Sequence, residues 1–165
     1  MSITKPSEEM LSNAIGQVVQ VVNVMNGAVA TGTTLLPSDD TIPTYAEGIE
    51  VMTLDITPTS ATNKLLIQVV VSCAGSAEEK MGIALFQDGT GTDAAIASNQ
   101  VKQQANDQGF IMLNHYMTSG TASSTTFNVR LGGHSSGTWT FNGTAAGRIF
   151  GGVMSSSITI TEITV

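Results

Sequence analysis

The sequence predicts an all-β fold, namely a jelly-roll-like antiparallel β-sandwich of about 8–10 strands. Three observations lead to this prediction. The β-branched residues Thr, Val and Ile, which favour strands, are abundant. Short apolar runs alternate with turn sequences, to which the 17 glycines contribute. No segment of helical periodicity separates these runs, so the strands are expected to follow one another directly.

The individual strands are expected where apolar and β-branched residues cluster between turns. The turn sequences include PSDDTIP at 37–43, which is rich in residues that favour bends. Asp88-Gly89 and Asn142-Gly143 are the best candidates for tight turns, because both pairs tolerate positive φ. In chain order, the expected strands are 16–25, 49–56, 64–74, 80–87, 109–118, 125–132, 138–142, 148–154 and 157–165, with a weaker one at 94–97.

Residues 1–15 differ from the rest and are expected to form a short N-terminal arm, helical or extended, ahead of a β-sandwich domain at 16–165. Pro6 and Glu8 suit a first helical turn, and Gly16 suits a helix end. A helix this short is not stable alone in water. The arm therefore packs on its own domain or docks on a neighbouring molecule. Its apolar stripe consists of Met10, Leu11, Ala14 and Ile15.

The segment GQVVQVVNVM at 16–25 is apolar on both faces of a strand. Its polar residues Gln17, Gln20 and Asn23 recur at every third position, which matches neither a half-buried strand nor an amphipathic helix. A monomeric sandwich buries only one face of such a strand, so we expect the other face to meet another chain or another layer. Which face is core and which is interface stays open. The predicted oligomer interface consists of Val18, Gln20, Val22 and Val24.

The C-terminal segment SSITITEITV changes phase along its length. Ile158 and Ile160 share one face of a strand, whereas Ile163 and Val165 fall on the other face. A bulge near Glu162 would restore a single apolar face. Alternatively, the last residues pack against something on the opposite side.

Composition and charge exclude several classes of function. The chain has 6 Lys and Arg residues against 13 Asp and Glu residues, which disfavours nucleic acid because phosphate contacts need clustered cations. The single cysteine, Cys73, is expected to be buried, and it cannot form an internal disulfide. Acidic residues stand where a signal peptide would be apolar, and no apolar run reaches the roughly 20 residues that cross a membrane. We expect synthesis in the cytoplasm without a signal peptide, and no membrane partner.

Two motifs with catalytic or metal-binding associations are interpreted as turns. GHSSG at 133–137 has the spacing of a nucleophile elbow, but another strand-like run follows it instead of a helix. A Ser135 nucleophile would also need a later histidine, and His134 is the last one in the chain. DGTGTD at 88–93 lacks the spacing of a calcium-binding loop. We predict no catalytic residues, no metal site and no cofactor.

Trp139, in the segment GTWTF, is the only tryptophan of the chain. Its ring could stack on a sugar, so Trp139 is a possible glycan contact under one alternative interpretation. A place in the core or at an interface is the more common role for such a side chain.

Five segments carry a resemblance to a known family: ITPTSATNKLLI (56–67), ALFQDGT (84–90), TTFNVRLGG (125–133), GTWTFNG (137–143) and SITITEI (157–163). They resemble small virion-associated proteins of tailed bacteriophages. The resemblance covers about residues 16–165 and consists of turn and strand signatures, not of active-site motifs. It implies a jelly-roll homotrimer that serves as capsid cement (decoration) or as the head of a fibre, with the N-terminal arm anchored to the particle.

We therefore expect a non-enzymatic virion structural protein, most simply a capsid decoration (cement) protein that binds the phage head as a homotrimer through residues 1–15. Its partners would be copies of itself and the major capsid protein or another virion protein, on the outer surface of the head. The alternative is a trimeric fibre-tip receptor-binding protein that recognises a host surface glycan. The absence of heptads, of a long shaft and of β-helical repeats favours decoration over a fibre tip.

Overall fold

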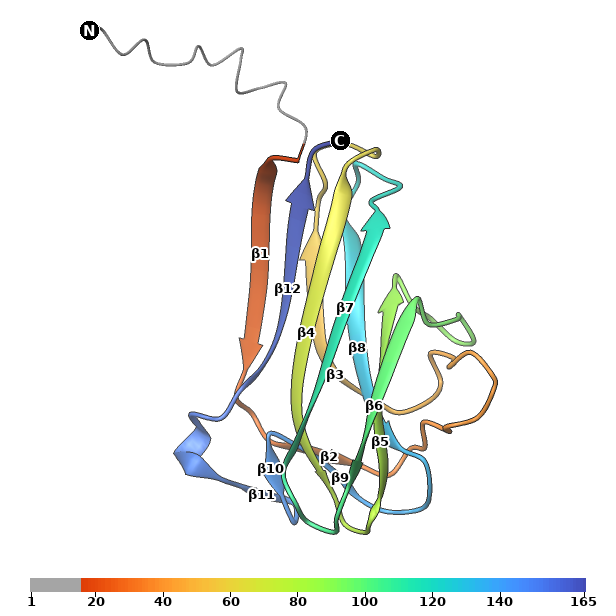
Figure 1. Cartoon of the computed structure of the whole chain (residues 1–165), viewed down its shortest axis with the longest axis vertical. Helices are drawn as coiled ribbons and strands as arrows, with labels where there is room; N and C mark the ends of the chain where they lie inside the picture. The colour runs from red at the N-terminus through yellow and green to blue at the C-terminus, as the bar shows by residue number, and fades with distance from the viewer. Residues whose placement is uncertain (1–15) are drawn as a thin grey trace, which may run out of the picture.

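Two antiparallel β-sheets face each other in the computed structural model, which describes residues 16–165 (Figure 1). These residues form twelve strands and one short 3-10 helix. The all-β antiparallel sandwich expected from the sequence is therefore confirmed. None of the helices among these residues has the length and apolar character needed to span a membrane. The predicted arm at 1–15, with its stripe of Met10, Leu11, Ala14 and Ile15, lies outside the described residues.

The first sheet is built around β4. One edge of β4 pairs with β12 and then with β9, while its other edge pairs with β7. β1 extends the sheet beyond β12, and β2 extends it beyond β9. The strands of this sheet are β1 (Val18–Asn26), β2 (Ala30–Gly32), β4 (Lys64–Gly75), β7 (Gly109–Thr118), β9 (Trp139–Phe141) and β12 (Ser156–Ile163).

The second sheet has the order β3-β8-β5-β6. Its strands are β3 (Ile49–Ile56), β5 (Glu79–Gln87), β6 (Ala97–Gln103) and β8 (Thr125–Gly133). A two-stranded hairpin, β10 (Gly143–Thr144) with β11 (Gly147–Arg148), stands apart from both sheets. The pairing of a β1-β12-β4-β7 sheet with a β3-β8-β5-β6 sheet is the strand order of a jelly roll.

The predicted strand positions hold for the long strands and fail in two short segments, and the short strand β2 was not predicted. The strand expected at 148–154 is wrong, because β11 ends at its first residue and the 3-10 helix η1 (Phe150–Gly152) follows. All three residues of η1 have positive φ, which an extended strand does not allow. The weak strand expected at 94–97 lies a few residues later, as β6.

The hydrophobic core lies between the two sheets. Alternation in β4 and β12 directs one set of side chains inward, and the second sheet supplies a matching set. Full burial of each such side chain is worth about 1.5–3 kcal/mol. The inward set includes Leu65, Ile67, Val69, Ile158, Ile160, Ile83, Leu85, Phe127 and Leu131.

The segment between β2 and β3 covers part of the outward face of the second sheet. Leu36 packs there beside Ala84 and Phe86. This close approach requires glycine at two cross-strand partners, Gly82 and Gly132. A Cβ atom at these positions would meet Leu36 atoms at 3.0 and 2.7 Å. The glycine pair therefore holds the covering segment close to β5 and β8.

Glu162 is a fully buried carboxylate on the inward face of β12. It accepts hydrogen bonds from Gln20 Nε2 and Asn63 Nδ2, both at 2.6 Å, and from the backbone N–H and hydroxyl of Thr59, both at 2.8 Å. Burial raises the pKa of Glu162, but these hydrogen bonds outweigh it and hold the pKa below its ordinary value. The carboxylate therefore joins β1, β12 and the turn after β3.

Glu162 also explains the change of phase in the last strand. β12 alternates without interruption, and its inward residues are Ser156, Ile158, Ile160 and Glu162. A hydrogen-bonded carboxylate thus occupies an inward position where the pattern calls for an apolar residue. The bulge expected near Glu162 lies instead in the neighbouring strand, between Val18 and Gln20 of β1.

We expect Glu162→Gln to lower the free energy of unfolding by about 2 kcal/mol at neutral pH, because hydrogen bonds to a buried charged group are worth about 1.5–3 kcal/mol. The folded-state pKa is depressed, so the carboxylate's contribution is fully present above its unfolded pKa of about 4.3. That contribution is lost as the pH falls through the folded-state pKa. Urea unfolding of both proteins from neutral to acid pH should show the difference shrinking in acid.

Asp40→Asn is the matched control, since Asp40 is an exposed carboxyl. Its removal should leave the free energy of unfolding within about 0.5 kcal/mol of the parent. A difference between the parent and Glu162→Gln that stays constant with pH would contradict the role assigned to the carboxylate.

Candidate functional site

The outward face of the first sheet is the leading candidate surface. Residues that pair directly across antiparallel strands share a face. The strands β1, β12, β4 and β7 therefore present rows of four paired side chains, and we call each row a rung. We call the surface formed by three successive rungs the three-rung surface. One outer rung consists of Val21, Thr161, Leu66 and Tyr116. The other outer rung consists of Met25, Ser157, Val70 and Met112. None of these residues is charged.

Large apolar side chains gather at both edges of the three-rung surface, and each of them is more than half exposed. At one edge stands the β1 patch, which consists of Val18, Val21 and Met25. At the other edge stands the β7 patch, which consists of Phe110, Met112 and Tyr116. Large exposed apolar side chains that gather on one face indicate a site where a protein meets a partner.

The middle rung is entirely polar. It consists of Asn23, Thr159, Gln68 and Asn114. Asn23 Nδ2 donates to Thr159 Oγ1 at 2.8 Å, and Gln68 Nε2 donates to Asn114 Oδ1 at 3.3 Å. The four side chains form a hydrogen-bonding stripe between two partly apolar rungs.

The side-chain amides of β1, at positions 20, 23 and 26, have separate roles because positions three apart alternate between the faces of a strand. Gln20 points inward and donates to Glu162. Asn23 points outward into the middle rung. Asn26 Nδ2 donates to the backbone oxygen of Val51 in the second sheet, at 3.2 Å. The spacing therefore ties one strand to three different parts of the protein.

The residues predicted as an oligomer interface do not lie on one surface. Val22 and Val24 pack against the protein's own core, which contradicts an interface role for them. Gln20 bonds to Glu162 and to the backbone oxygen of Thr57. Val18, which precedes the bulge in β1, lies on the exposed face. The even-numbered face of β1 beyond the bulge is the core face, and the exposed face belongs to odd-numbered residues.

The β7 patch was missed by sequence reasoning. The signal was present in FIMLNHYM at 110–117, where apolar residues occupy both faces of a strand, as they do in 16–25. Ile111 and Leu113 point inward and are buried, whereas Phe110 and Met112 point outward. The criterion applied to the first strand would have identified this one.

Trp139 lies in the core and not on the surface. Its side chain is fully buried, and its Nε1 donates to the backbone oxygen of Thr34 at 2.9 Å. The interpretation of Trp139 as a glycan contact is therefore wrong, because no face of the ring is accessible to a sugar.

The GHSSG segment is a turn packed over buried side chains. A Cβ atom at Gly133 would meet the Trp139 ring at 2.4 Å and the Glu79 carboxylate at 2.5 Å, and Gly137 is similarly close to Trp139. The Ser135 backbone N–H and hydroxyl both donate to Glu79 Oε2 at 3.3 Å. The two glycines of this motif thus make room for core side chains.

Neither histidine is a hydrogen-bond partner of Ser135 within residues 16–165. His134 Nδ1 accepts a hydrogen bond from the Ser38 backbone N–H at 2.8 Å, and His115 lies in β7 of the other sheet. Cys73 is buried, as expected, and burial raises the pKa of its thiol to about 12. Among the same residues, no three His, Cys, Asp or Glu side chains group in a way that could hold a metal ion.

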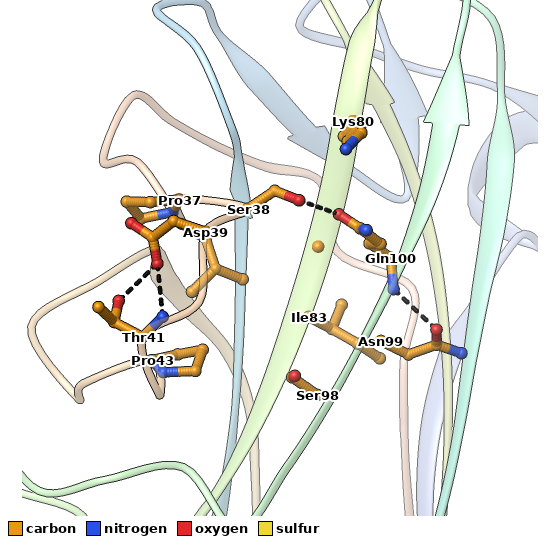
Figure 2. Close-up of a pocket in the computed structure, with 12 residues that line it drawn as sticks. Pro37, Ser38, Asp39, Thr41, Pro43, Lys80, Ile83, Ser98, Asn99 and Gln100 are labelled. Carbon is orange, nitrogen blue, oxygen red and sulfur yellow. Dashed lines mark hydrogen bonds between the residues drawn. The ribbon is translucent and has the colours of Figure 1, made fainter.

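A second candidate surface is a groove of about 290 Å³ on the outward face of the second sheet. The covering segment between β2 and β3 forms one wall, and β5 and β6 form the floor and the opposite wall (Figure 2). Its lining is mostly polar and includes Asp39, Lys80 and Gln100.

The model of one family, described as the Pgp3 C-terminal domain, matches residues 18–165. This match covers the whole sandwich from β1 to the C-terminus. No curated protein matches the sequence.

One solved structure supports the fold, and two others are more distantly similar. Eiger TNF from S. frugiperda aligns with a TM-score of 0.51 at 9% identity, over 86% of this chain and 92% of that one. The EclA C-terminal domain, described as a sugar-binding protein, aligns with a TM-score of 0.41 at 17% identity, over 69% of this chain and 73% of that one. A chain of infectious bursal disease virus, Gt strain, aligns with a TM-score of 0.46 at 11% identity, over 88% of this chain and 38% of that one. At 9% identity, the likeness to Eiger TNF shows the fold alone. The other two structures have TM-scores below 0.5 and are more distant.

We expect Glu79→Gln to stabilise the protein at neutral pH by about 1 kcal/mol. Burial raises the pKa of Glu79 more than the Ser135 hydrogen bonds lower it, and Glu79 Oε1 and Gln103 Oε1 are buried acceptors without a partner among the described residues. An amide at position 79 removes the buried charge and supplies an N–H. Because the folded-state pKa is raised, the parent loses stability relative to the variant as the pH rises above about 4.3. Thermal unfolding across this range measures the effect.

The neighbouring carboxyl gives a control of opposite sign. Glu78 is exposed and pairs with Lys102 at 2.7 Å, and the hydrogen bond from Lys102 holds the pKa of Glu78 below its ordinary value. Glu78→Gln should therefore be slightly destabilising at neutral pH. A change of stability in the same direction for Glu79→Gln and Glu78→Gln would contradict the environment assigned to Glu79.

Proposed function

We propose that this chain, which belongs to the Pgp3 C-terminal domain family, is a non-enzymatic structural protein that works as a homotrimer. The observation that carries the proposal is the three-rung surface. Its two edges hold the β1 patch and the β7 patch, and burial of each large side chain there would be worth about 1.5–3 kcal/mol. In a single copy these six side chains stay in contact with water, so the free energy of their burial is not gained.

Charge supports self-association through this surface. The chain carries a formal net charge of −7, so copies repel one another wherever acidic residues meet. The three rungs contain no charged residue at all. A homo-oligomer formed through them would bury no unpaired carboxylate, and a buried unpaired charge is strongly destabilising.

The arrangement of the patches supports a ring. The β1 patch and the β7 patch differ in composition and lie on strands at opposite edges of the β1-β12-β4-β7 face. Contact between two different patches is heterologous, and such contacts close into a ring when the rotation allows. We propose that three copies close it. The polar middle rung would fix the register of the contact, as single buried amides do in coiled coils.

The finer proposal is that the trimer decorates a virion. The resemblance to virion-associated proteins of tailed bacteriophages supports it, and the apolar stripe expected in residues 1–15 would dock on the major capsid protein or another virion protein. Three arms on one trimer would act together, so weak individual contacts would hold tightly through effective concentration. The protein would then lie on the outer surface of the head.

A second candidate function is receptor binding at a fibre tip. One observation favours it, namely the polar groove on the outward face of the second sheet. This groove opens away from the three-rung surface, so a trimer would present three copies of it to the outside.

The trimer is tested by light scattering on the full chain, with an expected mass three times the 17.1 kDa of one copy. Met112→Glu in the β7 patch and Met25→Glu in the β1 patch should each dissociate it, because a carboxylate would be desolvated at the interface. Both side chains are exposed in one copy, so the variants should fold.

Ile42→Glu is the matched control. Ile42 is also a largely exposed apolar residue, but it lies in the covering segment over the second sheet. This variant should remain trimeric. A monomeric parent chain, or dissociation by all three substitutions alike, would refute the proposed interface.

The docking role is tested by deleting residues 1–15. The truncated chain should keep its trimer and its melting temperature, since β1 begins at Val18. It should no longer sediment with virion heads, because its three apolar stripes are gone. Normal attachment of the truncated chain would contradict the decoration proposal.

A further inference from the structure

The groove on the outward face of the second sheet carries an inference beyond the structural role. We call it the β5–β6 groove, bounded by residues 36–43 on one side and by β5 and β6 on the other (Figure 2). We propose that the β5–β6 groove binds a neutral saccharide, such as the terminal sugar of a glycan.

The wall of the groove is fixed before any ligand arrives. Leu36 N donates to the backbone oxygen of Gly133 at 3.0 Å, and Ser38 N donates to His134 Nδ1 at 2.8 Å. Ser38 Oγ crosses the groove and donates to Gln100 Oε1 at 2.7 Å, a bond visible in Figure 2. A preformed wall loses little conformational entropy on binding, which favours affinity for a small ligand.

Polar groups around the groove have unused hydrogen-bonding capacity. Among residues 16–165, Lys80 Nζ, Gln100 Nε2 and Ser98 Oγ make no hydrogen bond. Asp39 accepts from the backbone N–H and hydroxyl of Thr41 through Oδ1 only, which leaves Oδ2 available. The groove thus offers donors, an acceptor and a hydroxyl. A sugar hydroxyl both donates and accepts, so a ring that carries several of them matches this mixture.

Charge and shape narrow the ligand class. Asp39 and Lys80 are the acidic and the basic side chain of the lining, so the groove has no net charge and favours neither an anion nor a cation. Pro37 and Pro43 add rigid apolar surface on the same wall, against which the C–H face of a pyranose can pack. The volume of about 290 Å³ suits a monosaccharide better than a larger molecule.

The groove stays accessible in the proposed trimer. Met81 and Ile83 of β5 point into the core between the sheets, so Lys80 and Gly82 face away from the first sheet. Gly82 has no side chain, which lets Leu36 pack against this part of the floor. Saccharide binding by the groove does not depend on the trimer. It rests on the same groove as the second candidate function, receptor binding at a fibre tip, and supplies a ligand class for it.

The test is saturation-transfer NMR on the full chain with the methyl glycosides of glucose, galactose, mannose and N-acetylglucosamine, followed by titration of any that bind. Gln100→Ala and Lys80→Ala should each weaken binding about fivefold, the effect of one lost hydrogen bond. Gln104→Ala and Lys102→Ala are matched controls, because both residues are exposed and lie outside the groove. The controls should bind like the parent.

Three results would overturn the proposal: no transfer to any glycoside, equal affinity in the groove and control variants, or preferential binding of N-acetyl-glycyl-glycine, which would indicate a peptide site. Light scattering on the same samples separates this inference from the proposed function. A trimer without glycoside binding overturns only the groove, whereas glycoside binding by a monomer overturns only the trimer.

Discussion

The register of β4 is the constraint on which the rest of the sandwich depends. This strand of 12 residues is hydrogen-bonded along both edges, to β12 and β9 on one side and to β7 on the other. A slip of one residue would turn Ile67 and Val69 out to water and Gln68 into the core. The same register aligns Gln68 with Thr159 and Asn114. One strand thus sets both the hydrophobic core and the pattern of the exposed face.

The sequence was sufficient for the fold class and the long strands, because alternation and turn residues are local signals. It failed where the decisive contact is between distant residues. The inward position of Glu162 depends on Gln20, Asn63 and Thr59, which a search for apolar alternation does not connect. The face of β1 that is core depends on a bulge whose position local sequence does not specify. For the same reason the sequence indicated two apolar faces in 16–25 but left open which was buried.

The candidate surfaces show the same limit. The β7 patch was detectable, because FIMLNHYM is apolar on both faces, but the pairing that places it opposite the β1 patch appears only in the folded sheet. The β5–β6 groove had no sequence signal. Its walls come from segments about 40 residues or more apart in the chain, and the close approach of Leu36 depends on the cross-strand pair Gly82 and Gly132. Trp139 was a reasonable surface candidate by residue type, and burial alone decided against it.

The amides of β1 have a consequence for the behaviour of the protein at high concentration. β1 is an edge strand, and a valine-rich edge with free backbone groups is a template on which another chain can extend the sheet. Gln20 and Asn26 reach from this strand to backbone oxygens at Thr57 and Val51, so side chains lie across the open side of the sandwich. They bridge β1 to the opposite sheet at this edge and leave the outward face of β1 uncovered. In a sequence poor in charge, we expect these hydrogen-bonded amides to hinder the sideways addition of another chain, a role that lysine has in many proteins.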